Sequence, residues 1–331
     1  MSVKSQLENQ GSPVRQFFEE YEDRVGRKEC LALLQSNKPF TPPLLESPSR
    51  SYYYYVGITI EYLIRYITNN NSLDFENTKA RSGWIPGEAR FVDQILFENV
   101  AQAYLDGRKV DELAVYSATA LAMLDSLRRS GMLPQSFSQQ VSDEKMSRIK
   151  RLPCGSNIDE KTVLFLFDEY CFDALSWEFY VQDVLTITSL FVDALNNPTG
   201  DLYQSKFVAY NQELAESTAA WGLGAEFDCV IQQNGRQILT DIKTTIRPLN
   251  IGHLRQLIVY ALFHDELLDG LAITDVGIYS SRAGSFRYLP IEDVIKKCMP
   301  AFKSIAEAKE RFFSEVIAEY VPFKPVGKRA N

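Results

Sequence analysis

The sequence predicts an α/β protein in which a mixed central sheet is flanked by helices and a large all-helical insertion interrupts the core. Two observations predict this class. After Pro198, short β-rich runs and helical patterns alternate in the order β-β-β-α-β-β-α, which describes a small α/β core. Between about Ala89 and Ala194 the apolar residues recur at helical spacing almost throughout.

The first seventy residues are predicted to be mostly helical. Helical patterns cover residues 14–23 and 28–35, and the Pro- and Ser-rich run PFTPPLLESPSRS that follows is typical of irregular connecting chain. Apolar residues again recur at helical spacing over residues 57–67, where a run of asparagines ends the pattern. We therefore expect an N-terminal arm followed by one helix of the core.

The last third of the chain predicts the sheet. Three strands are expected at KFVAY, AEFDCVIQQ and RQILTDIKTT, and Asn234-Gly235 predicts a tight hairpin between the last two because both residues tolerate positive φ. HLRQLIVYALFHDELL is predicted as an amphipathic helix, DVGIYSS and SFRYLP as strands, and residues 291–320 as one closing helix. The predicted parts are an N-terminal helical arm and linker (1–50), the core (51–85 and 197–322), the helical insertion (86–196) and a flexible tail (323–331).

Composition excludes several classes of protein. No apolar run approaches the roughly 20 residues that span a bilayer, and the first residues lack the apolar stretch of a secretory signal, so we expect no membrane partner and a cytoplasmic location. The five cysteines are scattered and never form CxxC, which argues against a disulfide framework or a zinc knuckle. A net charge of -8 argues against a chain that coats nucleic acid nonspecifically.

One set of residues in the predicted hairpin can carry chemistry. Asp228 is expected in its first strand, and Asp241 and Lys243, two residues apart, share one face of its second strand. Phosphodiester hydrolysis uses such a set, because carboxylates hold Mg²⁺ or Mn²⁺, the metal activates water, and a lysine orients that water or neutralises the phosphate. The simpler alternative is an edge hairpin with solvated charges.

The segments GAEFDCVI, ILTDIKTT and RQLIVYALF, followed by the strands in GIYSSRAGSFRYLP, resemble the RecB-like branch of the PD-(D/E)XK nuclease superfamily over roughly residues 220–290. The resemblance implies a PD-(D/E)XK restriction-endonuclease-like core. It also implies that Asp228 and Asp241 are metal ligands for Mg²⁺ or Mn²⁺ and that Lys243 is the catalytic lysine.

The same resemblance extends to three further residues. Gln256 and Tyr260, one helical turn apart, match positions that contact the site or the nucleic acid. Glu61, which follows Gly57 in GITIEYL, would be an outer metal ligand or an orienting acid, the alternative being an ordinary helix-surface residue. Many relatives bind an iron–sulfur cluster through downstream cysteines, but only Cys298 lies downstream here, so no iron–sulfur cluster is expected.

The function implied by the resemblance is a metal-dependent nuclease, with DNA favoured, acting as an exonuclease or a structure-selective endonuclease in repair, phage replication or defence. The candidate nucleic-acid contacts are Arg247, Lys145, Arg148, Lys150, Arg151 and Arg282. The insertion is a candidate site for a protein partner. Two alternatives stay open: a noncatalytic nucleic-acid-binding or assembly protein that retains the fold, and a helical interaction module with an incidental α/β tail.

Overall fold

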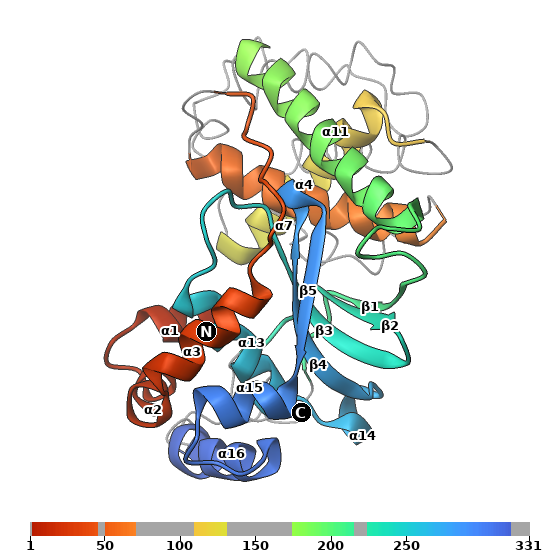
Figure 1. The fold of residues 1–331 in the computed structure, drawn as a ribbon. Helices are drawn as coiled ribbons and strands as arrows, with labels where there is room; N and C mark the ends of the chain where they lie inside the picture. Colours follow the sequence, from red (N-terminus) through yellow and green to blue (C-terminus); the bar gives the residue numbers. More distant parts are fainter. Residues whose placement is uncertain (1, 46–49, 71–108, 131–173, 215–223, 319–331) are drawn as a thin grey trace, which may run out of the picture. The chain divides into compact units, whose positions relative to one another are not determined.

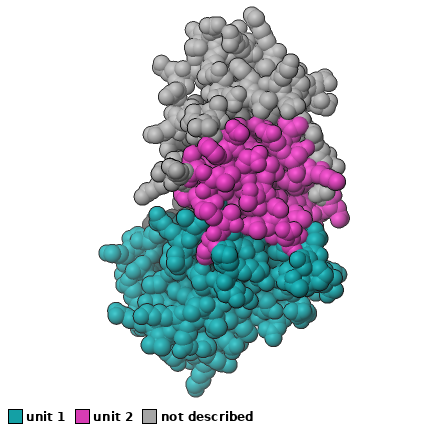
Figure 2. All heavy atoms as spheres, turned by 45° about the horizontal axis from the view of Figure 1, so that its top comes forward, with its two compact units in different colours: residues 1–39, 194–331 teal, residues 40–193 magenta. Residues whose placement is uncertain are grey.

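The computed structural model describes residues 2–45, 50–70, 109–130, 174–214 and 224–318 (Figure 1). The chain forms two compact units, coloured separately in Figure 2. The first joins Met1–Pro39 to Ala194–Asn331, and the second is Phe40–Asp193. These units differ from the predicted parts, because the N-terminal segment belongs to the unit that holds the sheet, and residues 51–85 belong to the other.

The first unit is an α/β structure built on a five-stranded mixed sheet in the order β1-β2-β3-β4-β5. Neighbouring strands are antiparallel except β3 and β4, which are parallel and are connected through helix α13 (Ile251–Phe263). This confirms the predicted order of strands and helices. The strands are β1 (Lys206–Tyr210), β2 (Cys229–Gln233), β3 (Arg236–Lys243), β4 (Ile273–Ser280) and β5 (Ser285–Pro290).

The predicted hairpin joins β2 to β3. Gln233 pairs with Arg236, so the loop has two residues. Asn234 and Gly235 both adopt positive φ, at 52° and 76°, as a two-residue turn matched to the twist of the strands requires. The turn fixes the register, and the register in turn sets which residues of the two strands lie opposite each other.

Helices pack on this sheet from both ends of the chain. The N-terminal helices α1 (Val3–Glu8), α2 (Pro13–Tyr21) and α3 (Arg24–Leu34) bury side chains such as Val3, Leu7 and Phe18 in one core with α13. The segment predicted as an N-terminal arm therefore contributes to this core, and α1 was not predicted. The helical patterns over residues 14–23 and 28–35 match α2 and the greater part of α3.

The predicted closing helix is broken. Helix α15 (Ile291–Cys298) ends before Met299 and Pro300, and α16 (Ile305–Phe312) begins only after Ser304, continuing into a π-helical turn, Phe313–Ile317. Proline disfavours the helical conformation of the residue before it, so Pro300 accounts for the break. A short helix, α14 (Glu266–Asp269), follows α13.

The described part of the second unit is helical. Its helices are α4 (Arg50–Thr68), α7 (Glu112–Ser130) and nearly all of α11 (Ala174–Asn196). The Thr59 hydroxyl and the Tyr180 hydroxyl, both buried, lie 2.7 Å apart, and the Tyr52 hydroxyl donates to Asp183 at 3.0 Å. Helix α4 begins earlier than predicted, whereas the pattern over residues 89–107 and the tail lie outside the described residues. Within the described helices, none is long and apolar enough to cross a membrane.

Candidate active site

The carboxyl end of β3 brings Asp241 and Lys243 together. Side chains alternate along a strand, so residues two apart share a face. The Asp241 side chain is buried, and the Lys243 ammonium lies 2.5 Å from its Oδ2 atom, with 20% of the lysine side chain exposed. No described residue donates a hydrogen bond of ordinary geometry to that buried oxygen, so the ion pair with Lys243 balances its charge.

Asp228 lies across the hairpin from Asp241. It is half-buried in a bend directly before β2, not within the strand as predicted. Because Cys229 pairs with Thr240, the preceding Asp228 lies opposite the following Asp241. Its Oδ2 atom accepts the Ile242 N–H at 2.7 Å, and its carbonyl accepts the Asn211 N–H at 2.9 Å. The side chain thus ties the end of β3 to the start of β2.

The turn between β4 and β5 supports the same end of β3. Arg282 is fully buried, and its Nε donates to the Thr244 carbonyl at 2.8 Å, while the Ser281 hydroxyl donates to the Lys243 carbonyl at 3.3 Å. Arg282 was a candidate nucleic-acid contact. With 0% of its surface exposed, it has no face available to a phosphate, and it instead anchors the chain directly after Lys243.

The first turn of α13 borders Lys243. Asn250 caps the helix by accepting the His253 N–H, and the Asn250 N–H donates to the Nδ1 atom of His253 at 3.2 Å, which completes a capping box. Burial, followed by the positive charges of Lys243 and Lys4, lowers the pKa of His253 to about 4. His253 is therefore neutral near pH 7, and its imidazole lies within electrostatic reach of Lys243.

Further along α13, Gln256 and Tyr260 form a pair. The Gln256 Nε2 donates to the Tyr260 hydroxyl at 2.6 Å, and Tyr260 is buried with 4% of its surface exposed. The prediction that the two residues share one helix face is confirmed. Their role toward a substrate stays a prediction.

The other predicted site residues lie elsewhere. Arg247 is exposed in the connection between β3 and α13, where its N–H donates to the Thr245 hydroxyl. Glu61 is half-buried in α4, which belongs to the second unit. The basic residues of the insertion lie outside the described residues, and they are Lys145, Arg148, Lys150 and Arg151.

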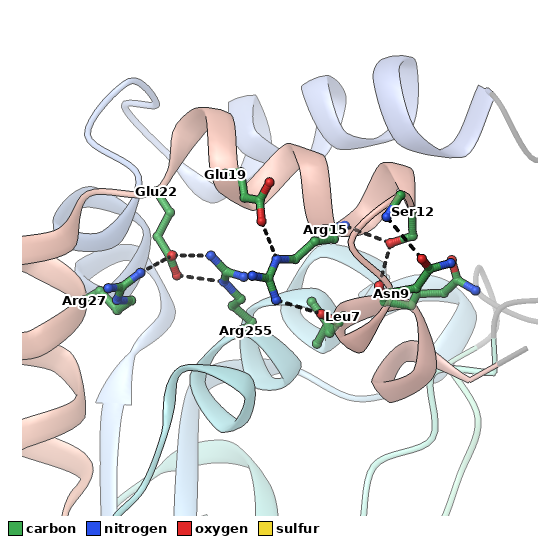
Figure 3. A network of polar contacts seen from close by, with 10 residues as sticks. Leu7, Asn9, Ser12, Arg15, Glu19, Glu22, Arg27 and Arg255 are labelled. Atoms are coloured by element: carbon green, nitrogen blue, oxygen red, sulfur yellow. Dashed lines mark hydrogen bonds and ion pairs between the residues drawn. The ribbon is translucent and has the colours of Figure 1, made fainter.

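A buried ion network that joins Arg255, on α13, to the N-terminal segment was not predicted (Figure 3). Arg255 donates to Glu22 through Nε at 3.2 Å and through a terminal nitrogen at 2.6 Å, and Arg27 donates to the same carboxylate at 2.7 Å. The Arg255 guanidinium also lies 5.2 Å from the centre of the Phe18 ring. Glu22 and Arg27 are five residues apart, whereas Arg255 lies more than two hundred residues later, so no local pattern links it to them.

Asp228 and Asp241 offer oxygen donors, which hard cations such as Mg²⁺ and Mn²⁺ prefer. The buried Asp241 Oδ2 accepts no hydrogen bond of ordinary geometry from a described residue, so it is an available oxygen donor, and the residues present fit such a metal. Across the described ranges, no group of three or more His, Cys, Asp or Glu side chains is placed to hold one ion. A Mg²⁺ ion commonly keeps several waters and takes one or two carboxylates, so two aspartates suffice.

Comparison with models of known protein families found no match, and neither did comparison with curated proteins.

Proposed function

We propose that this chain is a metal-dependent nuclease with a PD-(D/E)XK core of the RecB-like type. The observation that supports the proposal most is the convergence of Asp241, Lys243 and Asp228 at one end of the β2–β3 hairpin, with Asp241 buried and paired to Lys243. The order of the strands and α13 around this hairpin agrees with the motif order that suggested the family.

The reaction assigned to these residues is phosphodiester hydrolysis. Asp228 and Asp241 would hold Mg²⁺ or Mn²⁺, and a bound ion supplies a Lewis acid and a more acidic water. The Lys243 side chain is partly exposed and its ammonium lies beside Asp241, so it can orient the attacking water or neutralise the phosphate. His253 is neutral, and because its Nδ1 atom accepts the Asn250 N–H, its Nε2–H can donate a hydrogen bond at this edge without adding charge.

Nucleic acid is the substrate class that this chemistry serves, and DNA is favoured. Arg247 is an exposed cation four residues beyond Lys243, a position suited to a phosphate next to the one cleaved. The basic cluster Lys145, Arg148, Lys150 and Arg151 is proposed as a second contact. Glu61, Gln256 and Tyr260 are proposed as supporting residues, with Glu61 an outer ligand of the metal.

A structural role for the same aspartates is the competing proposal. Asp228 already accepts the Ile242 N–H, and Asp241 already pairs with Lys243, so both carboxylates have partners within the hairpin. In that case the chain would be a noncatalytic nucleic-acid-binding or assembly protein that retains the fold.

The deciding experiment is a cleavage assay with the full chain. Linear, circular and single-stranded DNA and RNA are incubated with Mg²⁺ or Mn²⁺, and with EDTA as the metal-free control. Asp241→Asn and Lys243→Gln should each lower cleavage on the order of 10²-fold or more. The circular substrate separates endonuclease from exonuclease activity.

Asp275→Asn is the matched control variant. Asp275 is a buried aspartate on β4 that pairs with Arg236, and it lies opposite Ile238, away from the end of β3 where Lys243 lies. Loss of cleavage in Asp241→Asn with normal cleavage in Asp275→Asn supports catalysis at the hairpin. Equal behaviour of wild type and all three variants on every substrate refutes the nuclease proposal.

A further inference from the structure

A pocket of about 600 Å³ lies in the first unit, lined by residues of α1, α2, α3 and the start of α13. The pocket is separate from Asp228, Asp241 and Lys243, none of which lines it. Its volume falls in the range of small-molecule sites, roughly 300–1,000 Å³. Five cationic side chains line it: Arg15, Arg24, Arg27, Lys28 and Arg255.

Two carboxylates line the same pocket, and both are already paired. Glu19 pairs with Arg15 at 2.6 Å, and Glu22 pairs with both Arg27 and Arg255 (Figure 3). Five cations against two carboxylates leave a net charge of +3 on the lining residues. The unbalanced charge creates a positive potential in a concave surface, which favours an anion.

Two of the cations have no internal partner. Arg24 and Lys28 are exposed on consecutive turns of α3, and neither forms an ion pair or a side-chain hydrogen bond with any described residue. The Nε atom of Arg27 is buried and likewise donates to no described acceptor. An unpaired buried donor costs free energy unless a ligand or water satisfies it.

The N-terminus of α13 adds to the positive potential in the pocket. Gly252, the second residue of the helix, lines it, and the first N–H groups of a helix carry partial positive charge and lack acceptors within the helix. Anions are stabilised at such a position. Here the helix start only reinforces the cationic pocket that the arginines and Lys28 form.

We propose that this pocket binds a phosphate group, as a phosphate monoester of about mononucleotide size. Guanidinium groups match the geometry of phosphate oxygens, and the two negative charges of a phosphate monoester neutralise more of the excess positive charge than a single carboxylate would. An apolar ligand is disfavoured, because seven of the eleven residues that line the pocket are charged, and Phe18, which also lines it, is fully buried.

The proposed phosphate site is independent of the proposed nuclease activity, because none of the hairpin residues lines the pocket. The two sites share the first turns of α13, where His253 lies within reach of the Lys243 charge and Gly252 and Arg255 line the pocket. The phosphate can come from a free nucleotide or from the phosphorylated end of a nucleic acid.

The test is calorimetric titration of the full chain in EDTA, which removes any contribution from a metal at the hairpin. The probes are inorganic phosphate, a nucleoside monophosphate, and a single-stranded oligonucleotide with and without a terminal phosphate. The double variant Arg24→Ala/Lys28→Ala should weaken phosphate binding on the order of tenfold. Both residues are exposed and unpaired, so the variant is expected to fold normally.

Lys296→Ala, which removes an exposed lysine on α15 outside the pocket, is the control and should bind as wild type does. Asp241→Asn should also retain binding, which separates this site from the hairpin. Preference for the phosphorylated oligonucleotide assigns a nucleic-acid end, whereas equal binding of the nucleoside monophosphate assigns a free nucleotide. Failure of every phosphate probe to bind, or wild-type affinity in Arg24→Ala/Lys28→Ala, overturns the proposal.

Discussion

Removal of the Glu22 charge should strongly destabilise the first unit. The Glu22 side chain is 1% exposed and accepts hydrogen bonds from Arg255, whose side chain is 6% exposed, and from Arg27, whose side chain is 15% exposed. Glu22→Gln keeps the shape of the side chain and removes its charge. Two guanidinium groups in a poorly solvated site then lose their counter-charge.

The magnitude follows from the geometry. At an effective dielectric constant of about 20 and a charge separation of about 4 Å, each ion pair contributes roughly 4 kcal/mol of attraction. Part of this is recovered because the glutamine carbonyl still accepts a hydrogen bond and water can enter. Removing one partner of a buried ion pair destabilises a protein by about 3–5 kcal/mol, and we expect Glu22→Gln to lower the free energy of unfolding by that amount.

Glu19→Gln is the matched control. Glu19 lies three residues earlier, its side chain is 50% exposed, and its partner Arg15, one helical turn away, is 31% exposed. Such a surface pair contributes about 0.3–0.5 kcal/mol. Urea unfolding followed by circular dichroism measures both variants. If Glu22→Gln costs no more than Glu19→Gln, the buried network does not stabilise the fold and the argument fails.

Two further predictions follow from single residues. Gly26→Ala should lower the free energy of unfolding by several kcal/mol or prevent folding, because a Cβ atom there would lie 1.8 Å from the Lys297 carbonyl oxygen. Thermal unfolding measures this effect. A melting temperature equal to that of wild type would contradict the close packing of α3 on α15. The free energy of unfolding should also decrease as the pH is lowered, because His253 has a pKa of about 4 in the folded chain, below its ordinary value of 6.5. Between these values the unfolded chain binds a proton that the folded chain does not, so acidification from pH 7 to 4 should cost up to about 2–3 kcal/mol after solvent screening. His253→Gln should lose correspondingly less stability in urea unfolding over that window, and an identical pH profile for both proteins would contradict the burial of a neutral His253.

Local rules predicted the hairpin well and its surroundings poorly. The Asn234-Gly235 turn and the alternation of side chains along β3 depend on residues adjacent in sequence, so the shared face of Asp241 and Lys243 could be predicted. The break at Pro300 was also visible in the sequence but was missed, because the apolar spacing on either side continues through it.

The remaining differences depend on contacts between distant residues. The pattern of α2 shows that the helix has an apolar face, but nothing local shows that Phe17 and Phe18 pack in the core of the sheet unit. Arginine is usually exposed, and the burial of Arg282 depends on distant partners such as the Thr244 carbonyl, 38 residues earlier, which accepts its Nε–H. Asp228 was assigned to a strand because its neighbours are apolar, whereas the register places the first strand residue at Cys229.

The surroundings of α13 explain why the cationic pocket could not be predicted from the sequence. The sequence motif on this helix consists of Gln256 and Tyr260, whereas the charges of the pocket other than Arg255 come from the N-terminal helical segment, more than two hundred residues earlier in the chain. Arg255 is adjacent to the motif, but its function depends on Glu22, which only the folded chain brings to it. A charged residue on a buried helix requires a partner. Glu22, which lies between α2 and α3, is the partner of the buried Arg255, and the other cations on these two helices give the pocket its excess of positive charge.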